Sequence, residues 1–464
     1  MGLVREVEAI LVQFRGVFSR HAAFEWFVVI AWAFMLRLEA FGVTSIVRCL
    51  GLAPPEYFNL LHFFHSTTFT VQALCARWAE IVKQGTQPIR VAGLPLFVVD
   101  GTKAGKAGRK MPAVKLLHQE STDNTKPEYI MGHYWGALSR LVQAGLHVFA
   151  LPLRFQIQDG LKRSPSEKAT LIDKMHVLIV QLVAAGSLVV ADAYYVAEGF
   201  LRALLAADIH FIGRARSNTV AYELPPPRRG RQRPGRPKTR GARVKLRDLF
   251  DRPELFRLAA VELYGDLKDI RYLCRDFLWH GLLVRFVLSI YTDGAQRILV
   301  CTNRDLSPEA ILYAYGLRFK IEVSFKAFVE TLCGFCYHFW LKAMPKIHLG
   351  SGNQFLHRAG AEYRRRVARK IEAYERFVNI SAIALGILQL LALRRPEHIW
   401  QHFPLWLRTL PKHGYPSENV VRLTLQHELH RISLTSTPGL VLTKILDKKK
   451  RAPDSAAHPM RIAA

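Results

Sequence analysis

The sequence predicts an α/β protein built on a mixed sheet, with mainly helical segments before and after it. Two short apolar runs, residues 94–100 and 187–192, have the composition of buried strands, and each ends in an acid. Segments with helical spacing alternate with these and other strand-like runs. Half of the 464 residues are hydrophobic, so the chain is long enough to bury two or more cores.

Residues 1–90 are expected to be helical. Residues 43–48 form a short predicted helix that ends near Gly51, and Pro54 and Pro55 stand where a second helix would begin. A short helix, a turn with glycine and a second helix fit a helix-turn-helix DNA reader. They fit a plain helical bundle equally well, and periodicity does not separate the two.

Residues 91–215 alternate between strand-like and helix-like runs, which indicates a mixed sheet with helices. Ser164 is the expected cap of the first helix in this region, and Gly186 its stop. The expected strands are 94–100, 136–143, 146–156, 187–192 and 209–215, and the expected helices are 165–185 and 197–207.

A basic segment interrupts this pattern. Residues 228–243 contain eight Lys or Arg and no acid, so they cannot form a core of their own. Strand-like runs return at 283–291 and 297–302. A long helix should then span 307–331, with Ser307 as its cap.

The rest of the chain, from residue 346, is expected to be helical, with a basic cluster at 364–370 and a frayed tail after Lys448. We therefore predict an N-terminal helical domain, an α/β core in two parts with an insertion between them, and a C-terminal helical domain. The boundaries are 1–90, 91–215, 216–298 for the insertion, 299–345 for the second part of the core, and 346–464.

The charge of the chain points to a polyanionic partner. Its 65 Lys and Arg exceed its 37 Asp and Glu, giving a formal charge of +28, and nucleic acid and acidic membranes are the usual partners of such a field. The most apolar run, 26–36, is too short to span a bilayer, which takes about 20 residues, and the N-terminus does not resemble a secretory signal. We therefore expect no membrane association.

The six cysteines indicate a reducing compartment. Cys333 and Cys336 form a Cys-x-x-Cys pair that is half of a zinc site, but no second such pair completes it. Ordinary buried thiols are the simpler interpretation.

Two acids follow apolar strands. Asp100 and Asp192 are both expected at strand ends, where acids on neighbouring strands can face one metal cluster. Each also has a structural alternative. Asp100 precedes Gly101, so the pair can begin a turn, and Asp192 can cap a helix or turn.

A third acid lies on the long helix. Tyr315, Arg318, Glu322 and Lys326 follow one another at steps of three, four and four, which places them on one helical face. A carboxylate flanked by two cations suits a DNA backbone at a metal site. The alternative is an exposed helical face with ordinary ion pairs.

Taken together, Val-Val-Asp100-Gly-Thr, Val-Val-Ala-Asp192-Ala-Tyr-Tyr and Tyr315-x-x-Arg-x-x-x-Glu322 resemble the three motifs of DDE transposases. These are ribonuclease-H-like enzymes of bacterial insertion sequences, here the group with a Tyr-Arg-Glu-Lys signature. The resemblance covers about residues 91–345. It implies a ribonuclease-H-like mixed sheet with a β-rich insertion, the first acid on the first strand, the second just after the fourth, and the third on a late helix.

The resemblance also implies a site chemistry. Asp100, Asp192 and Glu322 would be the catalytic residues and would hold two Mg²⁺ or Mn²⁺ ions. Tyr315 and Arg318 would position phosphates, as would Lys103. The signature lysine falls at Val329 here, so Lys326 is its expected substitute.

A tryptophan of the insertion often stacks on a flipped base in this family. Trp279 lies in the corresponding segment, and a core tryptophan is the alternative interpretation of it.

The implied function is cut-and-paste DNA transposition, with cleavage at the element's terminal inverted repeats and strand transfer into target DNA. A homodimer on DNA is expected, in the bacterial cytoplasm at the nucleoid. The basic insert would bind DNA, and residues 235–238 resemble an AT-hook core whose preceding arginine is replaced by Pro234. A nuclease without strand transfer and a domesticated DNA-binding transposase are the alternatives. The expected DNA contacts in the insert are Arg228, Arg229, Arg236 and Lys238.

Overall fold

The structure is a computed structural model of the chain. It describes residues 2–39, 42–119, 127–145, 147–225, 238–263, 266–406, 414–434 and 440–449. Three of the expected DNA contacts, Arg228, Arg229 and Arg236, lie outside the described residues, as do the AT-hook core up to Pro237 and the tail after Lys449.

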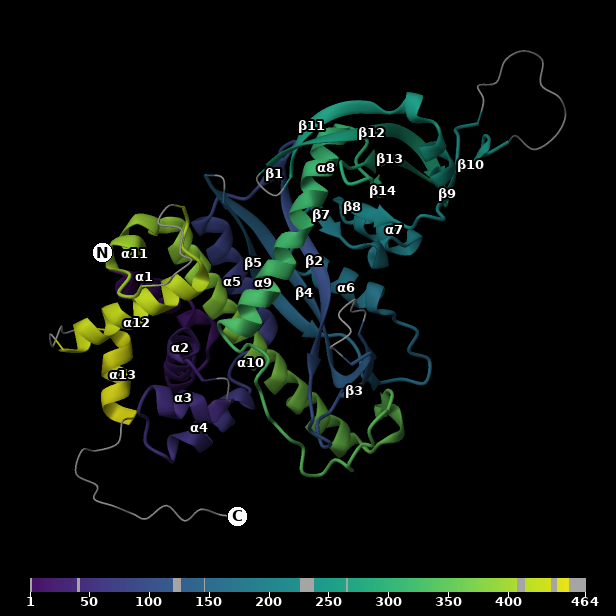
Figure 1. Cartoon of the computed structure of the whole chain (residues 1–464). Helices are drawn as coiled ribbons and strands as arrows, with labels where there is room; N and C mark the ends of the chain where they lie inside the picture. The colour runs from purple at the N-terminus through teal and green to yellow at the C-terminus, as the bar shows by residue number, and fades with distance from the viewer. Residues whose placement is uncertain are drawn as a thin grey trace.

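A large mixed sheet runs through the protein, with the N-terminal and C-terminal helices on one side of it, α6 and α7 on the other, and an extension at one end (Figure 1). Its strand order is β10-β9-β12-β13-β14-β8-β7-β2-β4-β3, with β1, β11 and β5 paired beside this path. The expected mixed α/β architecture is therefore confirmed. A second, two-stranded sheet pairs β6 (Leu161–Lys162) with β15 (Gln354–Phe355).

The strands of 91–215 form the centre of the large sheet. β2 pairs in parallel with β7, and β7 with β8, while β2, β4 and β5 are antiparallel. The five strands expected in this region are all present, and β2 and β4 are longer than expected. The bounds are β1 (Arg90–Val91), β2 (Leu94–Gly105), β3 (Lys115–His118), β4 (Tyr129–Ala144), β5 (His147–Ile157), β7 (Ser187–Ala191) and β8 (Ile209–Ala215).

One expected helix begins later and ends earlier than the sequence indicated. α6 (Leu171–Val180) is capped by Thr170, whose hydroxyl accepts from Asp173 N while the Asp173 carboxylate accepts from Thr170 N. This reciprocal cap fixes the start of the helix, so Ser164 does not cap it and the prediction of a helix from 165 was wrong. The next helix, α7 (Glu198–Ala206), agrees with expectation.

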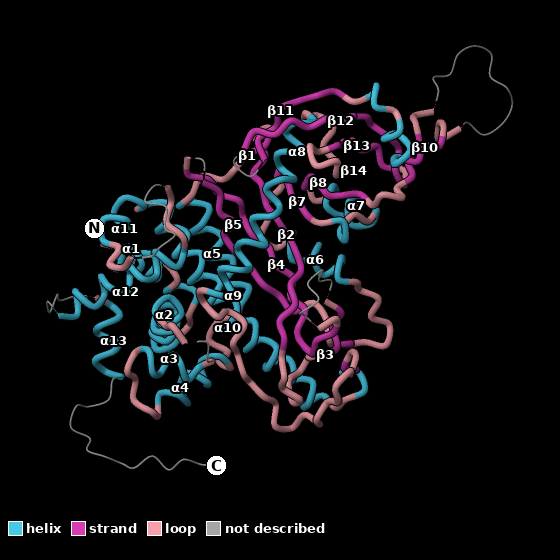
Figure 2. Tube along the Cα trace, in the orientation of Figure 1, coloured by secondary structure: helices cyan, strands magenta, loops and turns pink. Residues whose placement is uncertain are grey.

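The segment 216–298 is largely β, as expected, and extends the central sheet because β14 pairs with β8. Figure 2 shows these strands next to α8, where they continue the sheet from β8. Its strands are β9 (Val220–Tyr222), β10 (Arg243–Lys245), β11 (Arg257–Leu263), β12 (Asp266–Trp279) and β13 (Leu282–Ile290), and β14 (Gln296–Cys301) follows.

The long helix after β14 is present but is not uniform. Ser307 caps α8 (Pro308–Gly316) through Ala310 N, as expected. A short 3-10 turn, Leu317–Phe319, then leads into α9 (Lys320–Glu330). The tighter turn changes the angular spacing between Tyr315 and Glu322 from that of a pure α-helix.

The N-terminal helices and the C-terminal helices pack together around α10. The short helix pair expected at 43–64 is present as α3 and α4, and both contact α2, which is buried on all sides. This packing does not distinguish a DNA reader from a bundle. The helices are α1 (Leu3–Val12), α2 (His21–Leu36), α3 (Val43–Cys49), α4 (Glu56–Phe64), α5 (Val71–Gly85), α10 (Ala361–Arg394), α11 (Pro396–His402), α12 (Glu418–Leu434) and α13 (Val441–Lys449).

Helix α10 is the central helix of the described chain. It is long and apolar enough to cross a membrane, but 94% of its most apolar window is buried inside the protein. The core helix of a globular domain has the same property. Asn379 of α10 closes the free edge of β5, because its side-chain amide accepts from Phe155 N and donates to Phe155 O, each at 2.8 Å.

Candidate active site

Asp100 lies inside a strand rather than at its end. β2 continues to Gly105, and Asp100 is paired with Ala137 of β4. The prediction that the strand ends at this acid was wrong, and so is the alternative that Asp100 begins a turn. The reason is that β4 supplies an antiparallel partner well beyond the point where the parallel neighbour β7 stops.

Asp192 directly follows β7, as expected. The last registered pair between β2 and β7 is Val98 with Val190, so Asp100 and Asp192 each lie two residues beyond it on neighbouring strands. Neighbouring strands are about 4.8 Å apart. Asp192 stands where a cap would, but its side chain accepts no capping hydrogen bond, so the helix-cap alternative is not supported.

Helix α9 covers the same face of the sheet. Because Asp100 is registered with Ala137 and Ala137 with Phe155, these three side chains point to one face. Phe155 packs against Phe325 and Phe328 of α9, with ring centroids 6.0 and 4.9 Å apart. This contact holds α9 over the row that contains Asp100.

Glu322 reaches Asp100 through a shared arginine. The Arg318 guanidinium donates from Nη2 to Glu322 Oε1 at 2.6 Å and from Nη1 to Asp100 Oδ2 at 3.3 Å. Arg318 and Asp100 are about 20% exposed, whereas the Glu322 side chain is 51% exposed. The predicted ion-pair face of the helix is thus present, but its arginine points into the sheet toward a second acid.

The ionisation of Asp100 depends on its burial and on the charges around it. Burial raises the pKa of Asp100 to about 6, while Arg318 and the Gly101 N–H act in the opposite direction. The negative charges of Asp192 and Glu322 raise this pKa further. Asp100 is therefore a buried carboxyl group whose ionised form depends on nearby positive charge.

Tyr315 and Arg214 complete this face. Burial raises the pKa of Tyr315 to about 12, and the charges of Arg318, Asp192 and Arg214 also act on it. Arg214 is exposed on β8, and the pair Ala191 with Gly213 places it beside Asp192. Sequence reasoning missed Arg214 because only the register of β7 and β8 brings it to the acids.

Two of the expected phosphate contacts do not join this cluster. Lys103 is three residues from Asp100 on the same strand, and side chains an odd number of residues apart point to opposite faces. The expectation that Lys103 acts beside Asp100 was therefore wrong. Lys326 is exposed on α9, one turn after Glu322, and no contact within the described residues places it at the acids.

Two arginines hold the end of α9. Arg422 of α12 donates to Thr331 O at 2.8 Å, and Arg37, which follows α2, donates to Leu332 O at 2.9 Å and to Cys333 O at 3.2 Å. Cations at carbonyls that end a helix satisfy their hydrogen-bonding capacity and favour the helix dipole. The helix that carries Glu322 is thus fixed by both the N-terminal and the C-terminal helices.

The donor set suits a divalent cation with hard ligands. Carboxylate oxygens are the preferred ligands of Mg²⁺ and Mn²⁺, and the buried Asp100 with neighbouring Asp192 offers them at the sheet, with Glu322 above. Within the described ranges, no group of three or more His, Cys, Asp or Glu side chains is already close enough together to hold a metal ion. Cys333 and Cys336 likewise have no further ligands for zinc among these residues.

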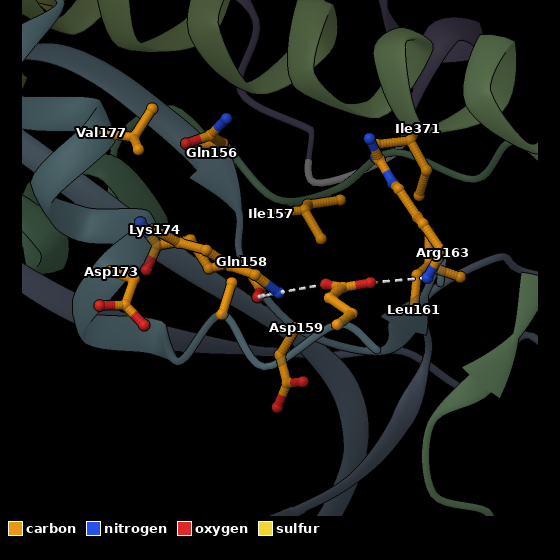
Figure 3. A pocket seen from close by; sticks show the side chains of 12 residues that line it. Gln156, Ile157, Gln158, Asp159, Leu161, Arg163, Asp173, Lys174, Val177 and Ile371 are labelled. Carbon is orange, nitrogen blue, oxygen red and sulfur yellow. Dashed lines mark hydrogen bonds and ion pairs between the residues drawn. The ribbon is translucent and has the colours of Figure 1, made fainter. Parts of the chain in front are cut away.

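A cavity of about 260 Å³ lies at the end of β5 (Figure 3). Its charged groups satisfy one another: Lys174 lies 3.4 Å from Glu167 and donates to Gln158 O, and Arg163 N donates to Glu167. None of the three candidate acids lines it. We interpret it as structural.

A more open cavity of about 530 Å³ lies in the insertion. Trp279 lines it and is 7% exposed, so the ring is mostly buried but has one edge at the cavity. The guanidinium of Arg240 stacks over Tyr222 at 4.9 Å. Lys238, the one expected insert contact within the described residues, is exposed nearby in sequence. The other lining side chains include Arg216, Arg243 and His280.

Comparison with known proteins gives one family. The family model described as "DDE superfamily endonuclease" matches residues 13–263. No curated protein matches the chain. Among solved structures, the piggyBac transposase in a synaptic complex with hairpin DNA is similar at a TM-score of 0.38 and 10% identity, covering 95% of this chain and 78% of that one. Because the score and the identity are so low, the hairpin DNA of that complex is said of that protein only and not of this chain.

Proposed function

Because the chain belongs to the DDE superfamily of endonucleases, we propose that it is a DNA transposase whose catalytic acids are Asp100, Asp192 and Glu322. The proposed reaction is strand cleavage at the ends of a mobile element followed by strand transfer into target DNA. The observation that supports the proposal is that Arg318 joins Asp100 and Glu322, while Asp192 directly follows β7, the neighbouring strand of β2.

The strand arrangement supports a ribonuclease-H-like core. Leaving aside the short strands β1, β3 and β6, the first four strands along the chain are β2, β4, β5 and β7. Asp100 is then on the first strand, Asp192 just after the fourth, and Glu322 on a late helix. This is the placement that the motif resemblance implies.

The proposed mechanism assigns binding and orientation to the residues of this face. Two divalent ions, when bound by the three acids, would supply a metal-activated oxygen nucleophile and stabilise the leaving oxygen. Arg318 and the exposed Arg214 would bind the phosphate oxygens on either side of the acids. Buried Tyr315 keeps its hydroxyl neutral and able to donate a hydrogen bond.

Substitution of Asp192 tests whether the three acids are catalytic. Asp192→Asn keeps the size of the side chain but removes its charge, so cleavage with Mg²⁺ should fall on the order of 10²–10³-fold or more. Affinity for duplex DNA should change little. Asp248→Asn is a matched control, because Asp248 is exposed in the insertion. Cleavage by Asp192→Asn near the wild-type rate would reject the assignment.

The same preparations separate the alternatives. A nuclease on this fold would cut but would not join a supplied 3′-hydroxyl end to a second duplex. A domesticated DNA-binding descendant would do neither. The presence of all three acids with their arginine favours an enzyme over the domesticated descendant, and strand transfer separates the transposase from the nuclease.

DNA is the proposed partner, and the basic insert is proposed to bind it without base specificity. Deleting 228–243 should weaken binding to random and element-end duplexes alike. It should also flatten the slope of log affinity against log salt by about 0.9 for each phosphate that the insert neutralises. Weaker binding to A·T-rich DNA alone would indicate an AT-hook instead. Assembly as a homodimer on DNA and a place at the bacterial nucleoid belong to the same proposal.

A further inference from the structure

Two stretches of the chain that contain no acid meet at the β3 end of the large sheet. Residues 101–119 carry five Lys or Arg and residues 331–361 carry three, and neither stretch contains Asp or Glu. They are far apart in sequence. Their meeting is therefore a property of the fold.

Backbone and side-chain hydrogen bonds join the two stretches. Leu341 N donates to Lys110 O and Ile347 N to Arg109 O, each at 2.9 Å. In return, Arg109 Nε donates to Ile347 O at 3.0 Å and Lys110 Nζ to Lys342 O at 3.1 Å. These four hydrogen bonds make one continuous surface, which we call the acid-free surface.

Few carboxylates neutralise the acid-free surface. Within the described residues, Lys115 pairs with Asp159 at 2.9 Å and His118 lies 3.5 Å from Glu128. Among the same residues, no carboxylate lies within 4.0 Å of the charged groups of Arg109, Lys342, Lys346 or Arg358, all of which are exposed. Trp340, whose side chain is 63% exposed, borders the same loops.

The acid-free surface continues the face that carries the catalytic acids. Trp135 and His133 are an even number of residues from Ala137 on β4, so their side chains point to the same face of the sheet as that of Asp100. Phe335 packs on Trp135 and Tyr337 on His133, with ring centroids 5.7 Å apart in both pairs. The stretch after α9 thus runs along β4 from the acids to the acid-free surface.

The acids and the acid-free surface lie along one strand. Gly105, where the loop of the acid-free surface begins, is five positions beyond Asp100 on β2, which is about 17 Å along the strand. A duplex of about five base pairs would cover that distance. The insertion lies at the opposite end of the same sheet, so the acids stand between two basic regions (Figure 1).

We propose that the acid-free surface binds the phosphate backbone of the duplex on the side of the cleavage point away from the insertion. This inference rests on the proposed function and names a second DNA contact for it. The basic cluster at 364–370 is a weaker candidate. Arg365 and Arg366 share Glu362, and Arg369 and Lys370 bind His65.

A triple variant tests the acid-free surface. Lys342→Gln, Lys346→Gln and Arg358→Gln together remove three exposed cations. Arg358 stacks on Phe355, and within the described residues the three side chains donate no hydrogen bond to the rest of the fold. The matched control is Arg5→Gln, Arg20→Gln and Lys83→Gln, which removes the same charge from exposed positions within residues 1–90. Thermal melting of both variants checks that they fold.

The measurement is the affinity for a 40-base-pair random duplex over a salt series, in EDTA so that no cleavage occurs. If all three cations contact phosphates, the slope of log affinity against log salt should flatten by about 2.7 in the triple variant, with little change in the control. An unchanged slope, or an equal change in both variants, would overturn the inference.

Two further outcomes are distinguishable. Loss of binding to phosphatidylserine vesicles with unaltered DNA binding would assign the acid-free surface to a membrane and overturn the proposal. Because the assay involves no catalysis, it is independent of the acids. A flattened slope together with full cleavage by Asp192→Asn would leave this inference standing while rejecting the proposed function.

Discussion

Glu375 of α10 should make the stability of the protein depend on pH. Its carboxylate accepts a hydrogen bond from Ile157 N of β5 at 3.2 Å, at the edge that Asn379 also closes. Burial raises the pKa of Glu375 to about 7, with Glu372 acting in the same direction and Arg154 and Arg163 opposing. The folded state therefore favours the neutral acid.

The direction and the size of the change in stability with pH follow from this pKa shift. In the unfolded chain Glu375 has its usual pKa of about 4.5. Below that pH the carboxyl group is neutral in both the folded and the unfolded state, so it does not lower the stability of the fold. As the pH rises from about 4.5 through 7, the folded state loses stability relative to the unfolded one. A shift of about 2.5 pKa units corresponds to at most about 3.4 kcal/mol. We expect about 1–3 kcal/mol, because part of the side chain reaches solvent.

Glu375→Gln isolates this contribution. The glutamine keeps an oxygen for Ile157 N but cannot ionise, so the variant should gain about 1–3 kcal/mol over wild type at pH 8 and little at pH 4.5. Urea unfolding at both pH values measures the difference. Glu397→Gln is the control, because Glu397 is exposed on α11. If Glu375→Gln and Glu397→Gln respond to pH alike, the reasoning about Glu375 is refuted.

Two other predictions concern the end of α9. The hydrogen bond from Cys336, together with Arg37 and Arg422, lowers the pKa of Cys333 below that of a free thiol. Alkylation of Cys333 by iodoacetamide, followed by mass spectrometry, should therefore reach half of its plateau at a lower pH than alkylation of the exposed Cys49, and the reverse order would contradict this. Arg422→Met should cost about 1.5–3 kcal/mol in urea unfolding, since Thr331 O loses a charged donor. It should also slow cleavage more than it weakens DNA binding, and equal effects on both would argue against a role in holding α9.

Local patterns in the sequence were sufficient for most elements. The strand before Asp192, the helix cap at Ser307 and the short helix pair at 43–64 all depend on residues next to one another in the chain. Periodicity and capping act over one or two turns, so a single sequence contains them.

The errors have both local and non-local causes. β2 extends past Asp100 because a distant strand pairs with it. α6 begins at Leu171 because Asp173 completes a local cap with Thr170 that Ser164 lacks. Lys103 was grouped with Asp100 by its distance along the chain, although the strand geometry turns it to the other face. Arg214 was missed because no local pattern links it to Asp192.

The candidate site is best understood as a row across the sheet. Phe155, Ala137 and Asp100 are in register on β5, β4 and β2, and Asp192 and Arg214 continue the row beyond β7 and along β8. At one end of the row Phe155 holds α9, and in the middle Asp100 meets the Arg318 that α9 carries. A slip of one residue between β2 and β4 would turn Asp100 away from α9, because strand side chains alternate. Nine registered pairs between β2 and β4 oppose that slip. The sheet therefore fixes the position of Asp100 firmly, while the more exposed Glu322 depends on the packing of α9.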